Sequence, residues 1–376
     1  MSRQPQRLLA HLFSSRALNG FLALSAGFFL LYALGAQGGG EAWGDSAEFQ
    51  EWVLRRTEFV CGAHFSNAHP FYVAFCRLVA STQLGVTLVS SFFGALSVGG
   101  FFLCTRRVGL SVVFGLSHML WWNSSVAEVQ TMNLAFTAFE TWCLLTFLDT
   151  RRTGWLVALA VLAGLHLNVH NFALLAYPVY AVVLVRQVVS AAKVGRVCAT
   201  LAGLVFLWAL AALPWLWACV VRGPADVLVG NYGAKVAGLW PGNLTLAAFN
   251  LALAAMSFFP PVAVWWWSRR DGVAARVPRF PVVFALFAVN FAFFIRYFVP
   301  DQATFLLPTL FFAYLLVSTC ELRRNRLAAL LAMQVLLPIL AWQVLLQLPT
   351  PDWKAKHPGR NDAAYFALPW KKGVQP

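Results

Sequence analysis

The stretch that decides the fold is SSFFGALSVGGFFLCTRR, Ser90–Arg107, in which an apolar run stops at two arginines. It belongs to an apolar segment, 86–105, that is long enough to cross the hydrocarbon core of a bilayer as a helix. Similar segments recur along the whole chain of 376 residues. The eleven predicted spans are 17–36, 86–105, 109–123, 127–148, 154–169, 172–191, 197–221, 244–267, 280–297, 303–320 and 326–347. The sequence therefore predicts an all-α polytopic membrane protein.

The composition supports this fold class. Hydrophobic residues make up 60% of the chain and charged residues only 11%, whereas a soluble domain carries about 25% charged residues. The alternation of period two that marks a porin-type barrel is absent. We therefore expect one bundle over residues 1–348, with a long first external loop at 37–85, and a short external tail over 349–376.

The positive charge is explained by membrane topology rather than by nucleic acid. Alternate loops, together with the N-terminus, hold 17 of the 28 basic residues and three of the 14 acidic ones. Such loops face the cytoplasm, so the N-terminus is predicted to be cytoplasmic and the C-terminus external. We expect a bacterial inner membrane, with an endoplasmic reticulum membrane as the alternative.

The seven cysteines are scattered, and none forms a C-x-x-C pair. The sequence therefore predicts neither a disulfide framework nor a zinc site. No D-x-D motif is present, and isolated acidic residues do not establish a cation site. The need for a divalent metal is left open.

The first external loop carries the acidic stretch GDSAEFQEW, Gly44–Trp52. Asp45 and Glu48 fit a capping box at the start of a helix, and they equally fit a catalytic pair. The segment that follows is amphipathic, which is typical of a helix on the membrane surface. A second short segment, HPFYVAFCRLVAST, carries Arg77 and is also predicted to lie at the interface.

Other polar side chains fall at or near the predicted external face: His69, Glu128, His170, Tyr232, Arg296 and Asp301. Several have a structural alternative: Glu128 as an interfacial charge, His170 bonded to the backbone, and Arg296 extended to the headgroups. Asp301 fits a helix cap. Taken together, a carboxylate can act as general base toward a hydroxyl, and cationic groups can stabilise a phosphate leaving group. This set predicts transfer from a lipid-phosphate donor.

Five motifs occur in order: DSAE at Asp45, HPF at His69, AEVQ at Ala127, GLHLNVH at Gly164 and VPDQATFLLP at Val299. This series resembles the GT-C superfamily of polyprenyl-phosphate-sugar-dependent glycosyltransferases, and in particular the protein O-mannosyltransferase-like family. The chain departs from the family pattern where Phe71 replaces a proline and Gln130 replaces a tyrosine. Either His166 or His170 corresponds to the family histidine; we prefer His170.

The resemblance implies a GT-C bundle that acts as an inverting transferase, with a hexose, expected to be mannose, moved from a polyprenyl-phosphate carrier to an acceptor hydroxyl at the external face. The lipid-linked sugar is the expected donor, an acceptor protein or glycan the expected partner. By similarity, Asp45 is the general base and Glu48 supports it or orients substrate. The predicted substrate-binding residues are His69, Arg77, Glu128, His170, Tyr232, Arg296 and Asp301.

Two other functions remain as alternatives. A transporter or flippase of lipid-linked sugar should have charges deep within its spans and broken helices repeated in two halves. Here only Glu140 lies clearly within a span, and no internal repeat is present. A catalytically inactive subunit that binds lipid-linked sugar is the second alternative, suggested by the proline missing after Pro70.

Overall fold

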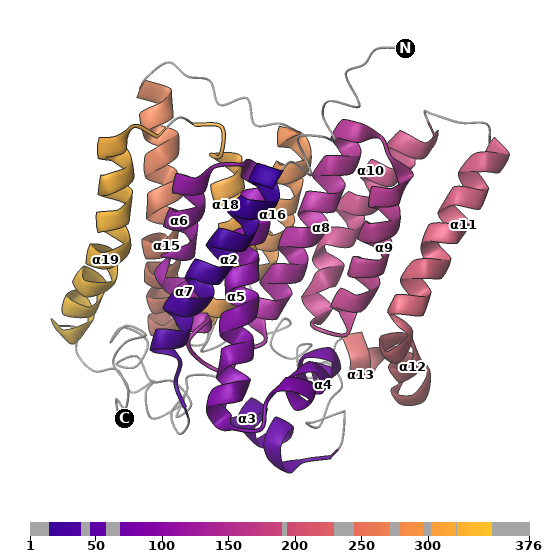
Figure 1. Cartoon of the computed structure of the whole chain (residues 1–376), viewed down its shortest axis with the longest axis horizontal. Coiled ribbons are helices and arrows are strands. Elements are labelled where there is room, and N and C mark those ends of the chain that lie inside the picture. Colours follow the sequence, from indigo (N-terminus) through magenta and orange to yellow (C-terminus); the bar gives the residue numbers. More distant parts are fainter. Residues whose placement is uncertain are drawn as a thin grey trace.

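The computed structural model describes residues 15–38, 46–57, 68–189, 194–228, 244–270, 279–295, 302–320 and 322–347. These residues form helices and connecting turns without a strand. The main helices stand side by side, and four short ones gather at one end of the bundle (Figure 1): α3 (Ser46–Arg55), α4 (Pro70–Val79), α12 (Leu213–Arg222) and α13 (Pro224–Leu228). The described parts of the predicted external loops lie at this end, which we call the polar end.

The predicted spans all correspond to helical segments. The long helices are α2 (Ser15–Gly35), α5 (Gln83–Thr105), α8 (Gln130–Thr150), α9 (Thr153–Leu167), α10 (Tyr177–Val189), α11 (Val194–Ala211), α15 (Leu244–Arg270), α16 (Phe280–Phe294), α18 (Leu307–Leu316) and α19 (Arg324–Gln347). Within the described residues, three helices (α2, α5 and α19) are long and apolar enough to cross a membrane, and the bent pair α11–α12 would be a fourth. The chain is thus an integral membrane protein, and a total of eleven spans stays a prediction.

Four predicted spans are interrupted. Span 109–123 divides into α6 (Val108–Gly115) and α7 (His118–Asn123), and span 172–191 opens with the 3₁₀ helix η2 (Asn171–Ala176). Span 197–221 bends by 72° between α11 and α12, and span 303–320 divides into α17 (Gln302–Phe305) and α18. Pro214 and Pro308 lie in the first turns of α12 and α18. Since proline lacks an N–H and fits only the first turn of a helix, the preceding helix ends before it.

The core of the bundle is aromatic and closely packed. Helix α5 packs between α2 and α8. Phe101 of α5 stacks on Phe114 of α6 with ring centroids 4.8 Å apart, and Phe311 and Tyr314 of α18 meet both rings edge-on. Edge-to-face contacts suit the charge distribution of aromatic rings. This cluster joins the first half of the chain to the second.

Helix α3 differs from the helix predicted to lie on the membrane surface. Its apolar face, Phe49, Trp52 and Val53, is buried. The Phe49 ring meets Tyr72 of α4 at a centroid distance of 5.1 Å, and the same hydrophobic cluster includes Phe93 of α5. The amphipathic pattern therefore reflects packing of α3 against protein, because α4 and α5 supply the apolar surface that the bilayer was predicted to supply.

The close packing of α9 on α11 depends on a glycine. A Cβ atom at Gly164 would collide with the backbone oxygen of Trp208, whereas a Cβ atom at Gly154 in the same helix would meet nothing within 4 Å. We expect Gly164→Ala to destabilise the protein by about 1–3 kcal/mol, as overpacking does, and Gly154→Ala to change stability little. Thermal unfolding of the two purified variants in one detergent tests this, and equal melting temperatures would contradict it.

Candidate active site and the polar chain beneath it

The structure describes five of the nine residues predicted for the site. They are Glu48, His69, Arg77, Glu128 and His170. Asp45, Tyr232, Arg296 and Asp301 lie outside the described residues. Helix α3 begins at Ser46, which puts Glu48 at its third position, where the capping-box pattern expects it.

His69 joins α4 to the turn that follows α9. It precedes α4 with a left-handed backbone, φ 43° and ψ 54°, a conformation that is uncommon for residues other than glycine and often occurs at functional sites. Its Nδ1 lies 2.8 Å from the carbonyl oxygen of Val169, and the N–H of Phe71 donates to the carbonyl of Asn168 at 2.9 Å. Burial lowers the pKa of His69 to about 4. At neutral pH the ring is uncharged, donates from Nδ1, and keeps Nε2 as an acceptor.

His170 lies directly against His69, with ring centroids 4.8 Å apart. Its Nδ1 accepts a hydrogen bond from the backbone N–H of Phe172 at 3.2 Å, and the two rings of His170 and Phe172 are 4.1 Å apart. Burial, together with the charges of His69 and His166, lowers the pKa of His170 well below its usual value. The polar end thus holds two neutral imidazoles in contact.

Glu128 is buried in the turn before α8. Its Oε1 accepts from the N–H of Val129 at 3.0 Å, while its backbone N–H and C=O both bond the hydroxyl of Ser90 at 2.9 and 3.0 Å. The hydroxyl of Tyr72 in α4 lies 3.0 Å from the same Ser90 oxygen. Burial, with Cys76 and Glu128 nearby, raises the pKa of Tyr72 well above its usual value. Glu128 and His69 are therefore held in one scaffold by α4 and α5.

Arg77 makes contacts typical of a structural residue. Its guanidinium donates to the carbonyl oxygens of Trp52 and Arg56 at 2.7 Å and of Thr57 at 3.2 Å. These carbonyls belong to the last turn of α3 and to the two residues that follow it, and a basic side chain at a helix C-terminus stabilises such orphan acceptors. A role for Arg77 in binding substrate stays a prediction, because these hydrogen bonds hold α3 on α4.

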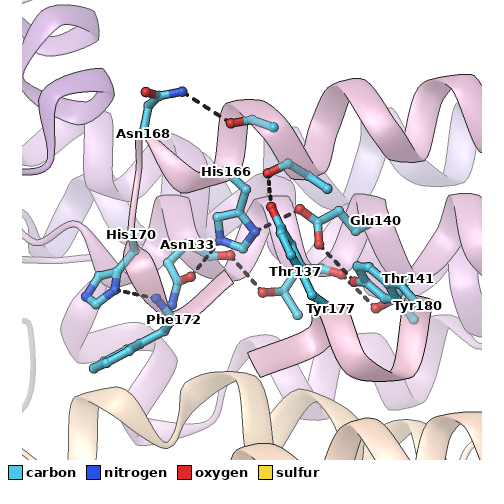
Figure 2. A network of polar contacts seen from close by, with 12 residues as sticks. Asn133, Thr137, Glu140, Thr141, His166, Asn168, His170, Phe172, Tyr177 and Tyr180 are labelled. Carbon is cyan, nitrogen blue, oxygen red and sulfur yellow. Dashed lines mark hydrogen bonds and ion pairs between the residues drawn. The ribbon is translucent and has the colours of Figure 1, made fainter. Parts of the chain in front are cut away.

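A chain of polar side chains leads from His170 into the bundle. His170 Nε2 lies 3.2 Å from Gln130 Nε2, and Gln130 Oε1 lies 3.1 Å from Asn133 Nδ2. Asn133 Oδ1 lies 2.7 Å from His166 Nε2, and His166 Nδ1 lies 2.8 Å from Glu140 Oε1. Figure 2 shows the inner part of this chain, where α8 and α9 carry the partners. His170 and His166, the two alternatives for the family histidine, thus occupy the two ends of one connected set.

The inner end of the chain is enclosed. Glu140 and His166 are 1% and 2% exposed, and Glu140 Oε2 accepts from the hydroxyl of Tyr180 at 2.8 Å. Both residues, together with Asn290 of α16, line a cavity of about 10 Å³. A cavity of this size has room for about one water molecule. Ionisable groups at this depth in a membrane protein are usually paired and functional.

The sequence contains a pattern that indicates this chain of polar side chains, and our prediction missed it. Gln130, Asn133, Thr137 and Glu140 follow steps of three, four and three residues, so they share one face of α8. An all-polar face on an apolar helix indicates a buried polar partner. That partner, His166, is on another helix, and only the fold identifies it.

No metal centre is evident within the described ranges, where no three His, Cys, Asp or Glu side chains are grouped so that they could hold an ion. The described groups supply neutral imidazoles, buried carboxylates and a fixed tyrosine hydroxyl. Such groups can orient hydroxyls of a sugar and its acceptor by hydrogen bonds.

The bundle and its polar end define an integral membrane protein with a GT-C-type fold. The chain is similar to the crystal structure of ArnT from Cupriavidus metallidurans bound to undecaprenyl phosphate, with a TM-score of 0.60, 17% identity, and coverage of 94% of this chain and 70% of that one. The apo structure of the same ArnT gives a TM-score of 0.56 and 17% identity over 91% of this chain and 68% of that one.

The family model described as the protein O-mannosyl-transferase TMEM260 N-terminal domain matches residues 107–193. The match runs from α6 through α10 and includes Glu128 and the whole polar chain from Gln130 to His170. None of the curated proteins compared with this chain matches it. The resemblance inferred from the ordered motifs is therefore confirmed.

Proposed function

We propose that the protein is an inverting glycosyltransferase that moves a hexose, expected to be mannose, from a polyprenyl-phosphate donor to an acceptor hydroxyl. The observation that carries the proposal is the contact of two motif residues, His69 and His170, at one end of a bundle that shares the fold of ArnT, with Glu128 bonded to Ser90 in the same scaffold of α4 and α5. One of the two similar ArnT structures is bound to undecaprenyl phosphate, which supports a lipid-linked donor here. The acceptor is a protein or a glycan.

The proposed chemistry is a single displacement at the sugar C1. Asp45 takes the proton of the acceptor hydroxyl, the acceptor oxygen bonds to C1, and the bond from C1 to the phosphate oxygen breaks with inversion. The products are the glycosylated acceptor and the free polyprenyl phosphate. Glu48 supports the base, and Arg296 stabilises the phosphate by charge-assisted hydrogen bonds.

The remaining residues are proposed to orient substrate. His69 presents the Nε2 of a neutral imidazole to a sugar or acceptor hydroxyl, and His170 and Glu128 are further proposed contacts. Arg77 is kept in the set as the residue that holds α3 in place. Tyr232 and Asp301 are further proposed contacts. We place the site on the external face, with a cytoplasmic N-terminus and external C-terminus, in a bacterial inner membrane or alternatively the endoplasmic reticulum.

Transfer by the purified full chain in lipid nanodiscs tests the proposal. The probes are polyprenyl phosphates that carry radiolabelled mannose, glucose or galactose, with a membrane-protein fraction as acceptor. We expect label on the acceptor and release of free polyprenyl phosphate, fastest with mannose. Donor binding without release under every acceptor would favour the inactive subunit. Movement of intact donor across proteoliposomes without release would favour a flippase.

A further inference from the structure

Two hydrogen-bond donors face each other in the polar chain, and its hydrogen atoms can be placed without this conflict in two ways. The backbone N–H of Phe172 can only donate, so the Nδ1 of His170 that faces it must be without a proton. A neutral imidazole carries one proton, which in His170 must then be on Nε2. That Nε2 lies 3.2 Å from Gln130 Nε2, and two donors face each other there.

The first resolution turns both amides, an exchange of oxygen and nitrogen that leaves every heavy-atom position occupied. The bonds then run in one direction. His170 Nε2–H donates to Gln130, the Gln130 amide to Asn133, the Asn133 amide to His166 Nε2, and His166 Nδ1–H to Glu140. The carboxylate of Glu140 is the final acceptor, and it accepts the hydroxyl of Tyr180 as well.

The second resolution adds one proton to the pair of His166 and Glu140. His166 then donates from both nitrogens, to Glu140 and to Asn133 Oδ1, and Asn133 donates to Gln130 Oε1, the orientation in which the two amides stand in the structure. Gln130 in turn donates to His170 Nε2. The proton of His170 must move to Nδ1, and its bond from the N–H of Phe172 is lost.

These two arrangements are distinct because mixed ones are costly. In a dry interior a donor facing a donor loses a hydrogen bond and gains repulsion. The pair of His166 and Glu140 is almost fully buried, and the adjoining cavity has room for only about one water molecule, which cannot satisfy every group of a misoriented chain. The chain is therefore expected to change direction as a unit when the pair gains a proton.

We propose that Glu140 and His166 are a positioning pair that determines, through Asn133 and Gln130, which ring nitrogen of His170 carries its proton. His170 contacts His69 at the polar end, so the pair sets whether Nε2 of His170 donates to Gln130 or accepts from it, and with that whether its Nδ1 carries the proton. The use of His170 toward substrate rests on the proposed function, whereas the coupling within the chain does not. Glu140 lies outside the five ordered motifs, and His166 is the alternative histidine of the fourth.

Groups from α8, α10, α16 and α18 face the pair of Glu140 and His166. Tyr180 on α10 bonds Glu140 directly, and Tyr177 on α10 and Cys143 on α8 lie within electrostatic range of it. From α16 and α18 the cavity is lined by Asn290, Pro308 and Phe312, none of which titrates.

Nitrogen NMR of the histidine rings tests the coupling without an assay of activity. The wild-type full chain, with ¹⁵N-labelled histidine, is purified into lipid nanodiscs, and His170 and His166 are assigned from His170→Gln and His166→Gln. At neutral pH we expect His170 to carry its proton on Nε2. Wherever lowering the pH is seen in the same spectra to add a proton to the pair, the His170 proton should move to Nδ1. If His166 titrates and the His170 tautomer stays the same, the proposal is wrong.

Variants distinguish coupling through the polar side chains from a general effect of burial on the His170 tautomer. In Glu140→Leu the Nδ1 of His166 has no acceptor, so its proton moves to Nε2 and the tautomer ratio of His170 should change at least fivefold toward Nδ1–H. Glu140→Gln, which can still accept from His166, should keep the wild-type tautomer. Gln334→Leu is the matched control, because Gln334 is buried and hydrogen-bonded to Val113 and Tyr314 away from the chain.

Asn133→Leu interrupts the chain and should abolish the response of His170 both to pH and to Glu140→Leu. A response that persists in Asn133→Leu would show that the coupling does not pass through the amides and would overturn the proposal. If the wild-type chain transfers no sugar while the His170 tautomer behaves as expected, the result counts against the proposed function and not against the coupling.

Discussion

Replacement of Asp45 by asparagine is expected to leave the fold intact and to lower kcat for sugar transfer by about 10²–10⁴-fold, the usual contribution of a general base. Asp45 directly precedes α3, which begins at Ser46, so it fits both a helix cap and a catalytic base. Asparagine caps a helix about as well as aspartate does, but its amide cannot take a proton. The substitution therefore removes the base and keeps the cap.

The measurement is single-turnover transfer from polyprenyl-phosphate mannose by the purified variant. Glu51→Gln is the matched control, since Glu51 is on the same helix, is exposed, and pairs only with Arg56 in its described contacts at 3.1 Å. We expect that control to transfer at the wild-type rate. Wild-type activity in Asp45→Asn with an unchanged melting temperature would leave Asp45 as a cap and refute its role as base.

The positions of the helices could be predicted because they depend on local composition. Each apolar segment became a helix or a pair of helices, and the short helices α3 and α4 occur where the first external loop was predicted to hold them. The breaks within four of the spans were not predicted. Three coincide with Pro178, Pro214 and Pro308, and a proline inside an apolar run carries this signal. The division between α6 and α7 contains no proline and has no such local signal.

The candidate site was only partly predictable, because its essential contacts join distant segments. The sequence placed His69, Glu128 and His170 on one face of the membrane, and the structure brings His69 and His170 into contact. Glu140 stood out as a charge within a span, but nothing local indicates that His166, 26 residues later, is its partner. Partner choice depends on how deep the turn after α9 lies in the bundle, which is a property of the packing of α8, α9 and α10.

Removal of the Glu140 carboxylate is the stability change expected to be largest. Glu140 accepts from His166 Nδ1 and from the Tyr180 hydroxyl, each at 2.8 Å, and it is 1% exposed. Glu140→Leu leaves the buried Tyr180 hydroxyl without its acceptor and the buried Nδ1 of His166 without a partner. Breaking a buried polar pair by removing one partner typically costs about 3–5 kcal/mol. We expect a loss of about 3 kcal/mol for Glu140→Leu and a much smaller loss for Glu140→Gln.

A double-mutant cycle distinguishes the pair from ordinary packing. Hydrogen bonds between membrane helices average only about 0.6 kcal/mol, so a loss near that value would mean that Glu140 acts as any polar residue. The double variant replaces both Glu140 and His166 by leucine. If the two depend on each other, its loss of stability should be about 1–3 kcal/mol smaller than the sum of the single losses. The reason is that each substitution removes the partner that the other would leave unpaired. Reversible unfolding in mixed micelles measures the four stabilities. Additive losses would show that the buried pair is not coupled, and with it the positioning pair would lose its physical basis.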